Sequence, residues 1–173
     1  MAIQKVGIVG AGTMGNGITQ AFVVAGVDVV MTDISDAAVQ RGLATIAGSL
    51  DRLIKKEKLT ADQKVAALGR IATSTDTTAV SECDLIVEAA TENEALKLKI
   101  FRQLDELSKP DAILASNTSS ISITKLAAVT RRPQQVIGLH FFNPVPLMAL
   151  VEVVSGLHTD PAAADAVHAL AQA

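Results

Sequence analysis

The sequence contains no tryptophan and no tyrosine, and its 173 residues include only four phenylalanines and one cysteine. The single cysteine, Cys83, cannot form an internal disulfide, which argues against a disulfide-stapled secreted domain and favours a reducing compartment. No apolar run approaches the roughly 20 residues that a transmembrane helix requires. The N-terminus also lacks the basic segment and unbroken apolar stretch of a signal peptide. These absences predict a soluble, cytoplasmic protein without a membrane partner.

The chain also lacks an excess of basic residues. Its formal net charge is -3, with 15 Lys and Arg against 18 Asp and Glu, which gives no footprint of a nucleic-acid-binding protein. Hydrophobic residues make up 49% of the chain and charged residues 19%, a composition typical of globular rather than disordered proteins. The length suits one domain with a substantial core. We therefore expect residues 1–173 to form a single domain that has no nucleic-acid partner.

What the chain does contain is a regular alternation of apolar runs and helix-length segments. The strand-like runs are residues 5–10, 27–33, 70–74, 84–90, 112–116, 135–142 and 149–155. The helical segments are residues 13–26, 36–57, 62–69, 93–109, 122–130 and 160–172. Most of the apolar runs are continuous, which suits strands that are covered on both faces. The alternation predicts an α/β fold with a doubly wound, mostly parallel sheet.

A glycine-rich motif links the first apolar run to the first helical segment. It consists of Gly10, Ala11, Gly12, Thr13, Met14 and Gly15. In a GxGxxG loop the first glycine permits a tight turn, the second allows a pyrophosphate to approach the backbone, and the third allows the helix to pack closely on the strand. The pyrophosphate then lies at the helix N-terminus, where free N–H groups point. The motif alone is weak evidence, but its place between strand and helix predicts a Rossmann-like, dinucleotide-binding fold.

The second strand-like run ends in an acidic residue, Asp33, which lies 18 residues after Gly15. A carboxylate at this place accepts hydrogen bonds from the ribose hydroxyls of the adenosine. It would also repel the 2′-phosphate of NADP, for which such sites usually offer an arginine nearby. The first arginine after Asp33 is Arg41, inside the next helical segment. The pattern favours NAD over NADP as the cofactor.

Residues 36–57 form a helical segment that is long for a crossover between two strands. A second, shorter helix at 62–69 is expected to fold back against it, so that the pair forms an arm inserted after the second strand. The long segment ends in the basic sequence KKEK, at residues 55–58. The default interpretation of these lysines is a solvated face, and the alternative is a basic clamp for an anionic part of a substrate.

Polar residues follow the fourth and fifth strand-like runs, and ligands bind at the carboxyl ends of the strands in such sheets. Glu88 and Glu92 lie in the sequence VEAATEN. Glu92 could equally supply charge to the first turn of the next helix, with Asn93 as its cap. The sequence SNTSS, at residues 116–120, could cap the following helix or bind a ligand, and capping is the default interpretation.

The sequence LHFFNPVP places His140 at the end of an apolar run, and Glu152 follows twelve residues later within LVEVV. The turn NPVP between the two runs predicts neighbouring strands that bring His140 and Glu152 together. A glutamate on an apolar strand is expected to be buried and to need a partner. Its carboxylate would fix the imidazole tautomer and leave the other ring nitrogen as an acid or base. We expect apolar neighbours to keep this pair away from water.

Taken in order, GAGTMG, VEAATEN, SNTSS, HFFNPVP and LVEVV resemble the NAD-binding domain of L-3-hydroxyacyl-CoA dehydrogenases. The short-chain, 3-hydroxybutyryl-CoA members are the most similar, and the resemblance covers essentially the whole chain. It implies oxidation of a 3-hydroxyacyl-CoA to the 3-ketoacyl-CoA with NAD, in fatty-acid or butanoate metabolism, by a homodimer.

The resemblance also implies roles for individual residues. His140 would be the general acid and base at the C3 oxygen of the substrate, with Glu152 as its orienting partner. Ser119 would contact both substrate and nicotinamide, and Asn143 the nicotinamide end. By the same resemblance, the further NAD contacts are Asp33, Glu92 and Lys97, and the further CoA contacts are Ser49 and Lys56.

The chain departs from the family pattern at its end. Family members continue into a helical domain that closes the cleft, supplies a further asparagine and forms most of the dimer interface, whereas this sequence ends at AVHALAQA. We therefore expect an N-terminal half, truncated or separately produced, without the C-terminal helical domain. The glycine loop begins ten residues from Met1, so an upstream hydratase domain is not expected. The alternatives are an NAD-binding fragment without turnover, or a related β-hydroxyacid or sugar-nucleotide dehydrogenase.

Overall fold

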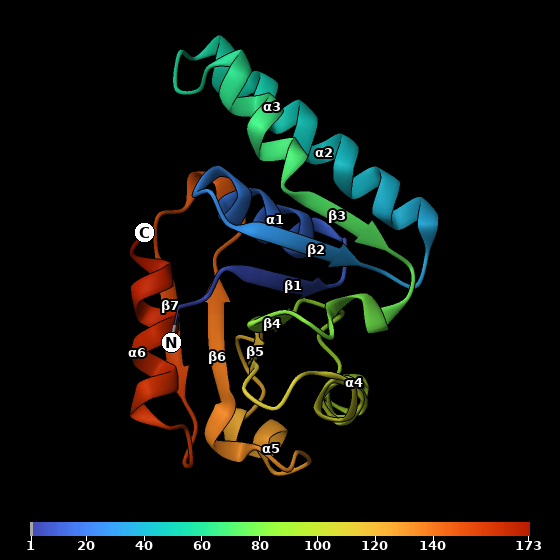
Figure 1. The fold of residues 1–173 in the computed structure, drawn as a ribbon, viewed down its shortest axis with the longest axis vertical. Helices are drawn as coiled ribbons and strands as arrows, with labels where there is room; N and C mark the ends of the chain where they lie inside the picture. The colour runs from blue at the N-terminus through green and yellow to red at the C-terminus, as the bar shows by residue number, and fades with distance from the viewer. Residues whose placement is uncertain (1) are drawn as a thin grey trace.

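A computed structural model describes residues 2–173, which form one seven-stranded sheet in the order β3-β2-β1-β4-β5-β6-β7 (Figure 1). Strands β1 to β6 pair in parallel, and β7 is antiparallel to β6. The strands are β1 (Lys5–Val9), β2 (Asp28–Thr32), β3 (Ile71–Ser74), β4 (Leu85–Glu88), β5 (Ile113–Ser116), β6 (Val136–Phe141) and β7 (Val151–Ser155). The predicted doubly wound, mostly parallel sheet is confirmed.

Helices join these strands. They are α1 (Thr13–Val24), α2 (Asp36–Lys55), α3 (Ala61–Gly69), α4 (Glu94–Leu107), α5 (Ile123–Ala127) and α6 (Pro161–Ala171), with short 3-10 helices η1 (Thr77–Val80), η2 (Pro133–Gln135) and η3 (Val145–Leu147) that the sequence pattern did not predict. Helix α5 is shorter than expected and ends at Ala127. The carbonyl oxygen of Ala127 accepts a hydrogen bond from the Thr130 hydroxyl at 2.8 Å. Among the helices of residues 2–173, none is both long and apolar enough to cross a membrane.

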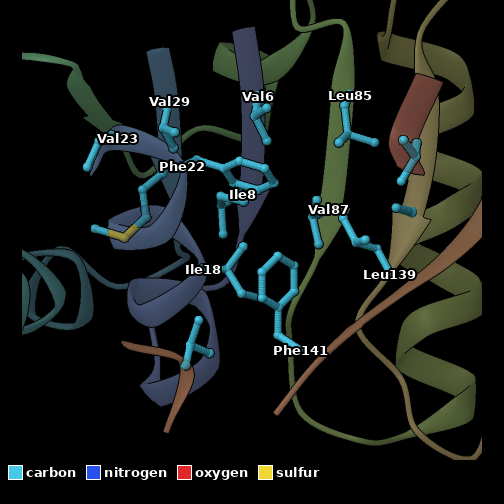
Figure 2. Close-up of a cluster of buried hydrophobic side chains, with 14 of the residues drawn as sticks. Val6, Ile8, Ile18, Phe22, Val23, Val29, Leu85, Val87, Leu139 and Phe141 are labelled. Carbon is cyan, nitrogen blue, oxygen red and sulfur yellow. The ribbon is translucent and has the colours of Figure 1, made fainter. Parts of the chain in front are cut away.

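The core occupies both faces of the sheet, which explains why the strand sequences are continuously apolar. On the face covered by α1 and α6, Ile8, Ile18 and Leu139 pack together (Figure 2). There the rings of Phe22 and Phe141 meet edge to face, with centroids 6.0 Å apart. On the opposite face, the buried residues come mainly from α4, α5 and the strands: Ile86, Phe101, Leu104, Leu114 and Leu126.

Helices α2 and α3 form the predicted arm, which projects beside the β3 edge of the sheet (Figure 1). The two helices are linked by an ion pair between Lys64 Nζ and Asp51 Oδ1 at 2.6 Å. Helix α3 begins with a capping box, in which Thr60 and Gln63 exchange side-chain and backbone hydrogen bonds. The arm therefore carries its own helix-start signals and extends from the doubly wound sheet as the sequence indicated.

Candidate active site

The glycine loop between β1 and α1 contains glycines that are required for two different reasons. Gly10 has a positive φ of 111°, and a Cβ there would lie 2.7 Å from the carbonyl oxygen of Ala89. A Cβ at Gly15 would overlap the carbonyl oxygen of Gly10. The fold itself therefore requires these two glycines. A Cβ at Gly12 would meet no atom within 4 Å, so this position keeps open space that a ligand can enter.

A cleft of about 370 Å³ lies beside this loop, between the ends of β1 and β2 and helix α4. Asp33 lines it, and its Oδ2 accepts a hydrogen bond from the backbone N–H of Ala11 at 2.9 Å. Gly12 is the N-cap of α1 and provides no side-chain acceptor, so the first N–H groups of the helix remain available for an anion. The open space at Gly12, the helix N-terminus and Asp33 together fit the pyrophosphate and ribose of a dinucleotide.

Glu92 lies outside α4, and its side chain is 45% exposed. Its Oε1 accepts a hydrogen bond from Thr118 Oγ1 at 2.7 Å, and its Oε2 is 3.4 Å from the backbone nitrogen of Ser119. Helix α4 begins at Glu94 and is capped by Asn93. Glu92 therefore lies before the helix, which excludes the interpretation that it supplies charge within the first turn. The default interpretation of SNTSS as a helix cap is wrong, because Ser122 caps α5.

Lys97, by contrast, is buried. Its side chain is 2% exposed, and its Nζ lies 2.7 Å and 2.9 Å from the two carboxylate oxygens of Glu88. Nζ also lies 3.8 Å from Oε1 of Glu92. Lys97 is one of the predicted NAD contacts, but its pairing with Glu88 was not predicted. The available signal was an acidic residue, Glu88, at the end of the apolar run LIVE, since a buried carboxylate needs a partner.

His140 and Glu152 are paired in register on the antiparallel strands β6 and β7, and His140 Nδ1 lies 3.2 Å from Glu152 Oε2. The ring of Phe142 lies 4.5 Å from that of His140, between centroids. The expectation that this pair is kept dry is wrong for Glu152, whose side chain is 51% exposed, although that of His140 is only 18% exposed. The physical reason is that β7 is the edge strand: Val151 and Val153 turn to the α6 face, and Glu152 turns to the other.

Ser119 and Asn143 lie on exposed loops that follow the neighbouring strands β5 and β6. The loop after β5 is joined to the last residue of β6 by a hydrogen bond of 2.8 Å from the backbone N–H of Phe141 to Asn117 Oδ1. The peptide bond between Asn143 and Pro144 is cis. The structure therefore brings these two predicted site residues to the carboxyl ends of adjacent strands, and His140 also lies at that end of β6.

A second groove of about 170 Å³ separates the arm from the turn that follows β6. It is lined by Ser49, Arg52, Leu53 and Lys56 of the arm and its end, and by Pro144, Pro146 and Leu147. Within residues 2–173, neither Arg52 nor Lys56 forms an ion pair with a carboxylate. Arg52 was not predicted to lie here, although its spacing of three and four residues from Ser49 and Lys56 places it on the same helix face.

Comparison with known proteins agrees with this geometry. The family model of the NAD-binding domain of 3-hydroxyacyl-CoA dehydrogenase matches residues 5–173. The crystal structure of (S)-3-hydroxybutyryl-CoA dehydrogenase from Ralstonia eutropha is similar with a TM-score of 0.97 and 61% identity, over 99% of this chain and 60% of that one. The chain belongs to the 3-hydroxyacyl-CoA dehydrogenase family, of which it forms the NAD-binding domain.

Two curated relatives show how far the similarity extends. The 3-hydroxybutyryl-CoA dehydrogenase of Bradyrhizobium diazoefficiens is 50% identical over 164 residues, which are 95% of this chain and 56% of that protein. The 3-hydroxyadipyl-CoA dehydrogenase of Escherichia coli is 45% identical over 157 residues, which are 91% of this chain and 33% of that protein. This 3-hydroxyacyl-CoA dehydrogenase domain thus spans little more than half of the first relative. NAD is the cofactor of the domain family, and the cleft at Gly12 and Asp33 fits it.

Proposed function

We propose that this chain supplies the NAD site and the acid–base centre of an enzyme that oxidises short-chain (S)-3-hydroxyacyl-CoA, such as 3-hydroxybutyryl-CoA, to 3-ketoacyl-CoA. The reaction belongs to fatty-acid or butanoate metabolism. The observation that carries the proposal is the 3.2 Å contact between His140 Nδ1 and Glu152 Oε2, at the same edge of the sheet as the glycine loop. The relatives named 3-hydroxybutyryl-CoA dehydrogenase support the choice of substrate.

The geometry supports a role for His140 as the general acid and base of this reaction. An ionised carboxylate only accepts hydrogen bonds, so Glu152 selects the tautomer in which Nδ1 carries the proton and Nε2 has a free lone pair. Nε2 accepts the proton of the C3 hydroxyl during oxidation and returns it during reduction, while the carboxylate stabilises the imidazolium. Ser119 holds the C3 oxygen with its hydroxyl. NAD, when bound, supplies the hydride acceptor.

The groove between the arm and the β6–β7 turn is proposed to hold the CoA. Ser49 and Lys56 contact its phosphate groups, because a hydroxyl and an ammonium without a carboxylate partner suit an anion. Arg52 adds a second cation to the same groove. Pro144 and Pro146, on the opposite wall, lie within six residues of His140, so a CoA held here directs its acyl group toward the acid–base centre.

The chain is further proposed to work as a homodimer in the cytoplasm. Leu147, which lines the groove, and Leu150, three residues later, are 72% and 59% exposed, which suits burial against further protein. The single, buried Cys83 suits a reducing compartment. Light scattering tests the first point, and cell fractionation the second.

The test of function is reduction of acetoacetyl-CoA with NADH. We expect a polypeptide of these 173 residues to bind NADH but to turn over the substrate poorly, because Glu152 is half-exposed and the thioester is not held near the hydride donor. The same residues joined to the remaining part of the Ralstonia relative should be active. Comparable kcat/KM for the two proteins would show that residues 1–173 suffice, and inactivity of both would contradict the proposed function.

A further inference from the structure

The carboxylate of Glu88 is the most densely bonded buried group at the carboxyl edge of the sheet. It has no exposed surface. Its Oε1 accepts hydrogen bonds from Ser116 Oγ at 2.7 Å and from Lys97 Nζ at 2.9 Å. Its Oε2 accepts from Lys97 Nζ at 2.7 Å and from the backbone N–H of Ala90 at 2.7 Å. One carboxylate therefore joins the end of β4, helix α4 and the end of β5.

Both side-chain partners of Glu88, Ser116 and Lys97, lead to the loop that carries Ser119. Ser116 Oγ accepts a hydrogen bond from the backbone N–H of Thr118 at 3.2 Å. Lys97 Nζ lies 3.8 Å from Glu92 Oε1, which accepts the hydroxyl hydrogen bond of Thr118. Thr118 is thus fixed at its backbone through one partner and at its side chain through the other, one residue before Ser119.

The same loop also supports the catalytic strand. The backbone N–H of Asn117 donates to the carbonyl oxygen of Glu88 at 2.9 Å. The side-chain oxygen of Asn117 accepts the backbone N–H of Phe141, the residue after His140, at 2.8 Å. A shift of this loop would therefore move both Ser119 and the end of β6.

We propose that Glu88 is a positioning residue: through Ser116 and through Lys97 with Glu92, it fixes the loop of residues 116–119 and so places Ser119 for the cofactor and substrate. This inference rests on the proposed function. A buried ion pair is often no more stabilising than apolar residues of similar volume, so stability alone does not account for this one. The hydrogen bonds of Glu88 instead connect residues at the carboxyl edge of the sheet, where the reaction is proposed to take place.

The test uses Glu88→Gln in this chain, with Asp105→Asn as the matched control. Asp105, on α4, is also a buried carboxylate: it is 5% exposed and forms an ion pair with Arg132. It has no hydrogen bond to residues 116–119. Two quantities are measured at a temperature where both variants are folded: amide hydrogen exchange at Thr118 to Ile121 without cofactor, and the Kd for NADH. Because the chain contains no Trp and no Tyr, NADH binding is followed by direct excitation of NADH rather than by energy transfer from the protein.

We expect Glu88→Gln to speed exchange in the loop and to raise the Kd for NADH about tenfold, because hydrogen bonds to a charged group are lost. Asp105→Asn should change neither quantity, although it lowers stability. Equal effects of the two variants would overturn the inference, as would a higher Kd without faster loop exchange. If Glu88→Gln fails to fold, Ser116→Ala removes one of the bonds, keeps the ion pair and should give a smaller change in the same direction; unchanged exchange would overturn the inference.

The cofactor-free exchange measurement separates this inference from the proposed function. If the unmodified chain does not bind NADH, the proposed function fails, yet the loop exchange of Glu88→Gln still decides whether Glu88 holds residues 116–119. If the chain binds NADH and the exchange does not change, the positioning role fails alone.

Discussion

Gly15 packs so closely on Gly10 that a side chain at position 15 would overlap the carbonyl oxygen of Gly10. This contact sets the distance between the start of α1 and the end of β1, and no ligand is needed to explain it. Gly12 differs, because a Cβ there meets only open space. The glycines of this motif are therefore needed for different reasons. Positions 10 and 15 require glycine for the packing of the chain, and position 12 requires it for the approach of a ligand.

Substitution by alanine separates these causes. Gly12→Ala should leave the thermal unfolding temperature nearly unchanged and weaken NADH binding about tenfold or more, because the new methyl group occupies the space of the pyrophosphate. Gly15→Ala should unfold at a lower temperature or fail to fold, since the contact with Gly10 is backbone and cannot yield easily. Circular dichroism and fluorescence titration measure the two effects. Unchanged NADH affinity in Gly12→Ala would contradict the placement of the pyrophosphate.

Asp33 predicts which cofactor is preferred. The carboxylate accepts the backbone N–H of Ala11 and lines the cleft, so a 2′-phosphate would meet a negative charge there. The unmodified chain should bind NADH more tightly than NADPH, and Asp33→Ala should weaken NADH binding and narrow the preference. The measurement is a titration with each cofactor. Equal affinity of the unmodified chain for both would argue against the role of Asp33.

The cluster around Asp105 predicts how stability depends on pH. Burial raises the pKa of Asp105, but hydrogen bonds from the Arg131 backbone and the Arg132 side chain outweigh it and hold the pKa below its usual value. A lowered folded-state pKa stabilises the fold above the unfolded pKa of about 3.9, and this stabilisation is lost as the pH falls through the folded pKa. At neutral pH, Asp105→Asn should lower the free energy of unfolding by about 1–3 kcal/mol.

Urea denaturation of both proteins at several pH values checks this prediction. The difference in free energy of unfolding between the unmodified chain and Asp105→Asn should narrow in acid, where Asp105 itself becomes protonated. A difference that stays constant from neutral to acid pH would show that the charge of Asp105 is not what stabilises the cluster.

The fold could be predicted from the sequence because its signals are local and agree with one another. The run VGIV before the glycine loop is apolar at every position, as a strand covered on both faces must be, and it became β1. Ser35 and Asn93 cap α2 and α4 with their side chains. Such patterns depend on neighbours in the chain, so no knowledge of the tertiary structure was needed.

Other features depend on contacts between distant residues and could not be predicted. The pairing of Glu88 with Ser116 joins residues 28 positions apart and follows from the register of β4 and β5. The exposure of Glu152 was predicted wrongly, because an apolar sequence around a glutamate does not tell whether its strand lies inside the sheet or at its edge. The roles of Ser119 and Asn143 came from resemblance and remain predictions.

The pair of His140 and Glu152 gives the sharpest prediction, to be made in an active enzyme that contains this chain. His140→Gln should lower kcat on the order of 10²–10⁴-fold, because a glutamine cannot accept and return the proton of the C3 oxygen. Glu152→Gln should lower kcat less, with little change in NADH affinity, since glutamine can accept the Nδ1 hydrogen bond but brings no charge to stabilise the imidazolium. The exposed His158 provides the control, and His158→Gln should retain full activity. Full activity of Glu152→Gln near neutral pH would mean that the 3.2 Å contact does not serve catalysis, and the acid–base centre would then rest on His140 alone.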